Sequence, residues 1–80
     1  MNFWKHGDIT ALAKLADMSA QRMHDVLHRR RGVSKERALI LADLTAKYFG
    51  YPLIDFEAWL FNKTTNHPAF FGDPLEENND

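Results

Sequence analysis

The sequence predicts an all-α fold, a small bundle of helices. Apolar residues recur at three- and four-residue steps, a good capping residue precedes most of these runs, and no strand-like alternation extends beyond a few residues. The 80 residues suffice for one domain with a modest core, because a chain of this size buries roughly 60–65% of the surface that it exposes when unfolded.

The first two helices are short and closely spaced. A helix is predicted over residues 8–16, with Asp8 as its N-cap after Gly7, and a second helix begins where Ser19 can cap it. Only Asp17 and Met18 separate the first helix from this cap. The predicted inward residues are Ile9, Leu12, Ala13, Leu15 and Ala16 in the first helix, and Met23, Val26 and Leu27 in the second.

A third helix is predicted over residues 35–49. The stretch 31–33 interrupts the helical pattern, and Gly32 there tolerates a left-handed backbone that arginine would not. Ser34 then caps the new helix, and Gly50 ends it. Its apolar face contains Ala38, Leu41, Ala42, Thr45 and Phe49.

The remaining residues differ in composition. Asp55 can cap a short helix through Phe61 that carries Phe56, Trp59 and Leu60. Extended structure is expected around residues 69–71. We therefore predict one domain over residues 1–72, with a core at 8–50 and an aromatic extension at 51–72, followed by a disordered acidic tail at 73–80.

Composition excludes several classes of protein. The absence of cysteine removes disulfides, thiolate catalysis and cysteine-based zinc fingers. No long apolar run follows the single lysine of the N-terminus, and no stretch has the roughly 18 apolar residues of a membrane span. We expect a cytoplasmic protein that has no membrane partner and needs no cofactor.

Charge is divided unevenly along the chain. Residues 1–50 hold nine Lys/Arg against five Asp/Glu, whereas residues 51–80 hold one against six. Such a division suggests that the first part meets a polyanion. A solvated run of charges is the simpler interpretation if no further pattern supports this one.

Residues 9–28, ITALAKLADMSAQRMHDVLH, resemble the helix-turn-helix of the phage repressor and Cro family (the lambda repressor-like superfamily) and of repressors of the lactose-repressor type. Asp17 departs from the pattern, because it stands at the turn where the family usually has glycine. Aspartate adopts a left-handed conformation more easily than most residues, so the turn can still form. The residues at places that the family keeps apolar are Leu12, Ala16, Met18, Met23 and Val26, and Ala13 is at the place that it keeps small.

This resemblance, which extends to about residue 50, implies sequence-specific binding of double-stranded DNA by a homodimeric transcriptional regulator, a repressor of phage or bacterial type. Such a protein is associated with the nucleoid when it is bound. The second helix would enter the major groove. The candidate DNA-binding residues on and before it are Ser19, Ala20, Gln21, Arg22, His24, Asp25 and His28. Candidate phosphate contacts follow at Arg29, Arg30, Arg31, Lys35 and Arg37.

The candidate readers differ in their chemistry. Gln21 can pair with the N6 and N7 edge of adenine, Ala20 can touch a thymine methyl, and Arg22 can reach guanine or a phosphate. Asp25 is the exception, since DNA repels a carboxylate. Such a carboxylate is tolerated if it accepts a hydrogen bond from cytosine N4 or orients an arginine. Pairing with Arg22 or Arg29 is an equally good interpretation of Asp25.

A metal site is a weaker alternative. The segment HDVLH (24–28) resembles the zincin motif with Asp in place of Glu, and His24 and His28 share one helical face. A catalytic zinc ion needs a third protein ligand, and the spacing of His6 and His67 indicates none. No nucleophile with a spaced base and no phosphate-binding glycine loop occurs, so the sequence gives no support for an enzyme.

The aromatic residues support a second alternative, a protein-interaction module such as an adaptor or an antitoxin-like partner. We expect Phe49, Phe56 and Trp59 to close the core. The others would then form an exposed patch, and exposed apolar patches often mark protein contacts. On this basis we predict a homodimer through residues 51–71.

Overall fold

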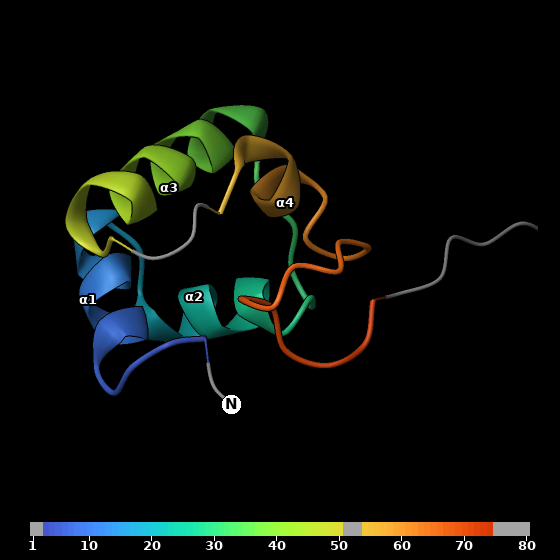
Figure 1. The fold of residues 1–80 in the computed structure, drawn as a ribbon, viewed down its shortest axis with the longest axis horizontal. Helices are drawn as coiled ribbons and strands as arrows, with labels where there is room; N and C mark the ends of the chain where they lie inside the picture. Colours follow the sequence, from blue (N-terminus) through green and yellow to red (C-terminus); the bar gives the residue numbers. More distant parts are fainter. Residues whose placement is uncertain (1–2, 51–53, 75–80) are drawn as a thin grey trace, which may run out of the picture.

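A computed structural model describes residues 3–50 and 54–74, which form four helices and no strand. These helices are α1 (Asp8–Leu15), α2 (Ala20–Leu27), α3 (Lys35–Tyr48) and α4 (Phe56–Leu60) (Figure 1). The predicted all-α class is confirmed. Among the described residues no helix is long and apolar enough to cross a membrane.

The start of α1 corrects one prediction. Gly7 is the N-cap, with a left-handed φ of 86°, and Asp8 is the first helical residue. The chain enters α1 through a tight turn in which the Asp8 N–H donates to the Lys5 carbonyl (3.0 Å). The Asp8 carboxylate therefore accepts from the backbone N–H of Lys5 (3.2 Å) and does not cap the helix. At the other end of α1, Leu15 was predicted to face inward but is exposed.

The turn between α1 and α2 forms as predicted. Asp17 adopts a left-handed φ of 58°. Its N–H donates to the Lys14 carbonyl (3.1 Å), and the Met18 N–H reaches back to the Ala13 carbonyl (2.8 Å). This is the Schellman pattern, which satisfies the last carbonyls of a helix.

The two ends of α2 are fixed in different ways. Ser19 accepts from the Arg22 N–H (3.1 Å), as predicted for its N-cap. At the C-terminal end the Schellman pattern is repeated: the Arg29 N–H donates to the Val26 carbonyl (3.1 Å) and the Arg30 N–H to the Asp25 carbonyl (2.8 Å). Between these ends Met23, Val26 and Leu27 are fully buried, as predicted.

The left-handed residue after α2 is Arg29, with a φ of 67°. The prediction that Gly32 would supply this conformation was wrong, because Gly32 lies outside the left-handed region. An L-residue adopts the left-handed conformation at a cost of roughly 1–2 kcal/mol. Contacts elsewhere in the molecule must offset this cost at Arg29.

The caps of α3 and α4 agree with the sequence. Ser34 accepts from the Arg37 N–H and Asp55 from the Ala58 N–H. Gly50 ends α3 with a left-handed φ of 63°. Helix α3 packs against both α1 and α4. Its buried residues are Ala38, Leu41 and Thr45, and those of α4 are Ala58 and Trp59.

The side chain of Arg29 offsets the backbone cost. It is only 5% exposed, and its guanidinium donates to four backbone carbonyls of the C-terminal segment, residues 61–74. The acceptors are the carbonyls of Asn62 (2.8 Å), Thr65 (2.7 Å), Phe71 (3.1 Å) and Gly72 (3.4 Å). Arg29 was predicted to bind phosphates, and its burial contradicts that prediction.

The C-terminal segment returns hydrogen bonds to the end of α2. The buried side chain of Asn62 donates to the carbonyls of Val26 (2.7 Å) and Arg31 (2.9 Å), and the Phe71 N–H donates to the Leu27 carbonyl (2.8 Å). In Figure 1 this segment, coloured orange to red, runs beside the C-terminal end of α2. We call these hydrogen bonds of Arg29, Asn62 and Phe71 the C-terminal clasp.

Most of the aromatic surplus lies in the core or packs against it. Trp59 and Phe70 are buried and meet edge to face with ring centroids 5.3 Å apart, and the Trp4 indole donates to the Ala69 carbonyl (2.8 Å). Phe61, by contrast, is exposed. The expected exposed patch is therefore largely absent from the described part of the extension. Tyr51 and most of the predicted acidic tail (75–80) lie outside the described residues.

We predict that Arg29→Ala lowers the free energy of unfolding by about 2–4 kcal/mol or more, because the substitution leaves carbonyls of the clasp without a donor. Arg29→Gly should be less destabilising than Arg29→Ala, by up to about 1 kcal/mol, since glycine takes the left-handed backbone without strain. Urea unfolding of the two variants measures both effects. An Arg29→Ala variant as stable as the unmodified protein would contradict the structural role of the guanidinium.

Candidate nucleic-acid interface

The outward face of α2 is polar and centred on Gln21, Asp25 and His28. These three residues lie opposite the buried trio of Met23, Val26 and Leu27, as the helical period of 3.6 residues requires. Gln21 and His28 are exposed, and Asp25 is half-buried. The helix is therefore fixed by one side and open to a partner along the other.

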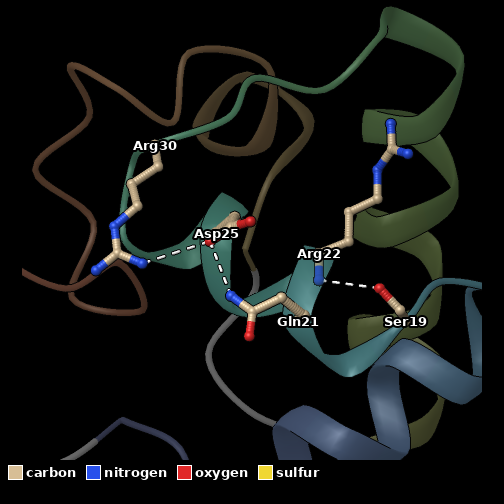
Figure 2. Close-up of polar contacts among 5 residues, drawn as sticks. All are labelled: Ser19, Gln21, Arg22, Asp25 and Arg30. Atoms are coloured by element: carbon tan, nitrogen blue, oxygen red, sulfur yellow. Dashed lines mark hydrogen bonds and ion pairs between the residues drawn. The ribbon is translucent and has the colours of Figure 1, made fainter.

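A hydrogen-bonded cluster occupies the centre of this face (Figure 2). The Gln21 amide Nε2 donates to Asp25 Oδ1 (3.2 Å), and Arg30 Nη1 lies 3.4 Å from the same oxygen. Asp25 thus pairs with an arginine, as one interpretation of the sequence expected. That arginine is Arg30, whereas pairing was expected with Arg22 or Arg29.

The cluster leaves hydrogen-bonding groups directed outward. Asp25 uses one N–H of Gln21, so the second N–H and the carbonyl oxygen of that amide remain for an adenine edge. Arg30 has five N–H donors, of which Asp25 uses one. The carboxylate in the middle of the face is thus compensated by groups of the protein itself.

Arg22 lies on one flank of α2. Its backbone N–H belongs to the Ser19 cap, and its exposed side chain leaves the helix in a different direction from Gln21 (Figure 2). The Ser19 hydroxyl accepts this bond and still has its own proton to donate. The guanidinium of Arg22 is thus placed at the edge of the exposed face rather than at its centre.

The predicted phosphate-binding residues separate into two groups. Arg30, Arg31 and Lys35 are exposed at the exit of α2 and the start of α3, as is Ala20 at the other end of α2. Arg29 is committed to the clasp, and burial lowers the pKa of its guanidinium while Asp73 opposes that shift. Arg37 donates to the Ala16 carbonyl (2.6 Å) and joins α3 to the end of α1.

The histidines are engaged in ring contacts. His24 and His28 stack with centroids 6.2 Å apart and planes at 28°, and His28 also stacks on Phe71 at 4.7 Å and 24°. His67 makes a separate contact, because its Nδ1 accepts from the Ala69 N–H (3.1 Å). Within residues 3–50 and 54–74 no three His, Cys, Asp or Glu side chains gather as metal ligands.

Sequence reasoning missed two residues that shape this site. Asn62 binds the carbonyls at the end of α2, and Phe71 supports the ring of His28. Both lie more than 30 residues away along the chain, and neither belongs to a periodic pattern. The one signal for them in the sequence is their residue type, polar for Asn62 and aromatic for Phe71. Many other residues of the chain share those types, so this signal could not single them out.

Comparison of the chain with models of known protein families, with curated proteins and with solved structures finds no match. The helix-turn-helix interpretation therefore depends on residues 9–28, on the left-handed turn at Asp17 and on the exposed polar face of α2.

Proposed function

We propose that the chain is a sequence-specific double-stranded DNA-binding protein, a transcriptional repressor of phage or bacterial type, and that α2 is its recognition helix. One observation carries the proposal. The exposed face of α2 presents base-reading side chains between basic flanks, while the opposite face is buried and both ends are capped.

The dimensions of α2 suit this role. Eight residues give a helix about 12 Å long, and the major groove, about 12 Å wide, admits a helix. Gln21 would address the base edges near the centre of the contact. Arg22 on one flank, with Arg31 and Lys35 beyond the C-terminal end, would bind phosphates of the two strands.

Two copies of the domain would bind one operator. A single helix offers few base contacts, and helix-turn-helix proteins of this size gain affinity as dimers on half-sites about 34–36 Å apart. Among the described residues of the extension that was predicted to hold the dimer together, Phe61 is the exposed aromatic side chain. The apolar surface available there is smaller than the sequence suggested.

The burial of the aromatic residues also weakens the rival interpretation, a protein-interaction module. That interpretation needed an exposed aromatic surface in the second part of the chain, and Trp59 and Phe70 are core residues. DNA binding is the better-supported proposal, because the exposed polar side of α2 carries side chains that can contact bases and phosphates.

Arg31→Ala combined with Lys35→Ala should weaken binding to all duplex sequences alike. Each lost phosphate contact reduces the salt slope, log Kd against log salt, by about 0.9, so the pair should reduce it by about two. Fluorescence anisotropy with random duplex DNA measures this slope. The control is Lys47→Ala, which removes an exposed charge paired with Asp43 on α3. If the unmodified protein does not bind DNA even at low salt, the proposed function is wrong.

Gln21→Ala should change sequence preference instead. Loss of a bidentate contact to adenine should remove about 1–3 kcal/mol of discrimination at one base pair of each half-site. Selection of binding sites from random DNA, with the unmodified protein and the variant in parallel, measures the change. Asn66→Ala, which removes an exposed amide from the C-terminal segment, is the matched control. An unchanged preference in Gln21→Ala would show that α2 is not the reading helix.

A further inference from the structure

We propose that a groove beside α2 is a binding site for a small planar aromatic anion. The groove has a volume of about 530 Å³, within the range of roughly 300–1,000 Å³ typical of small-molecule sites. It lies between the N-terminal segment 4–7, the first turn of α1, His24 of α2 and Phe71 of the C-terminal segment. Three parts of the chain that are distant in sequence thus contribute to it.

Two aromatic rings form its apolar side, and both are held in place without a ligand. The Trp4 indole, which is 4% exposed, donates to the Ala69 carbonyl. Phe71 is fixed by the hydrogen bond from its backbone N–H to the Leu27 carbonyl and by the stacking of its ring on His28. Ile9 adds an aliphatic contact. A flat aromatic ring can pack against these apolar side chains at little cost in ordering the protein.

The groove also favours a negative charge. Its lining includes Lys5, His6 and the hydroxyl-bearing Thr10, and it includes no carboxylate side chain. The start of α1 lines the groove, and its N-cap residue, Gly7, supplies no side-chain cap. Backbone N–H groups at a helix start attract anions, and they add to the side-chain donors here. The nearby carboxylate of Asp8 bonds to the Lys5 N–H and lies outside the lining.

Occupancy of the groove would be coupled to α2 through His24, which lines the groove and lies on the flank of the recognition helix. A ligand that restrains His24 would change DNA affinity, and DNA would change ligand affinity by the same factor. This regulatory consequence depends on the proposed function, whereas ligand binding itself does not.

The test uses 2-naphthoate as the probe, titrated into the full chain and followed by amide chemical shifts in two-dimensional NMR. Saturable shifts concentrated at Ile9, Thr10, His24 and Phe71 are expected. The neutral analogue 2-naphthalenemethanol should bind about tenfold more weakly, because it lacks the charge that the donors recognise. Equal binding of the two probes, no binding, or shifts spread over exposed apolar residues such as Leu39 and Phe61 would overturn the proposal.

Variants test the location of the site. His6→Gln changes an exposed lining residue and Phe71→Leu removes one aromatic wall, and each should weaken 2-naphthoate several-fold. Phe61→Leu, which removes an exposed aromatic ring outside the lining, is the matched control and should leave the affinity unchanged. Because His6 is exposed, its variant remains informative if Phe71→Leu fails to fold.

A second titration tests the coupling separately. At a concentration near its Kd for the unmodified protein, 2-naphthoate should shift the Kd of that protein for random duplex DNA, and it should shift the Kd of His6→Gln less. A bound probe with an unmoved DNA affinity would refute the coupling. Absence of DNA binding together with specific probe binding would refute the proposed function and leave the groove as a ligand site.

Discussion

A single buried guanidinium joins the two parts of this chain. Arg29 donates to four carbonyls of residues 62–72, and its side chain lies over the Phe70 ring, with Cζ 5.8 Å from the centroid. The C-terminal segment has no strand to satisfy these carbonyls, and a buried carbonyl without a donor is costly. Arginine suits this position because its planar fork directs five donors at once and its charge strengthens each hydrogen bond.

The presentation of α2 depends on this interaction. An isolated helix of eight residues is not stable in water, so α2 owes its order to its buried face and to its ends. Ser19 fixes one end, and at the other Asn62 and Phe71 donate to the carbonyls of Val26 and Leu27 in the last turn. The proposed reading face is thereby held in place before any partner binds, which reduces the ordering cost of recognition.

Local features of the fold could be predicted from sequence, because they depend on residues close together in the chain. The caps at Ser19, Ser34 and Asp55 are of this kind, and so is the left-handed turn at Asp17. The three consecutive arginines show where such reasoning ends. Arg29, Arg30 and Arg31 are chemically identical, and only contacts 33 to 43 residues away distinguish the buried residue from the exposed ones. The preference of glycine for the left-handed conformation was also misleading, since Arg29 rather than Gly32 takes that conformation.

Native-state hydrogen exchange tests most directly whether the clasp makes the C-terminal segment part of one cooperative domain with α2. The relevant amide is that of Phe71, which donates to the Leu27 carbonyl, and the reference amides are those of the buried residues Val26 and Leu27 in α2. If the clasp holds, Phe71 and α2 should exchange with opening free energies equal to within about 1 kcal/mol, as parts of one cooperative unit. Exchange of Phe71 at the low opening free energy of a fraying chain end, with α2 still protected, would contradict the clasp.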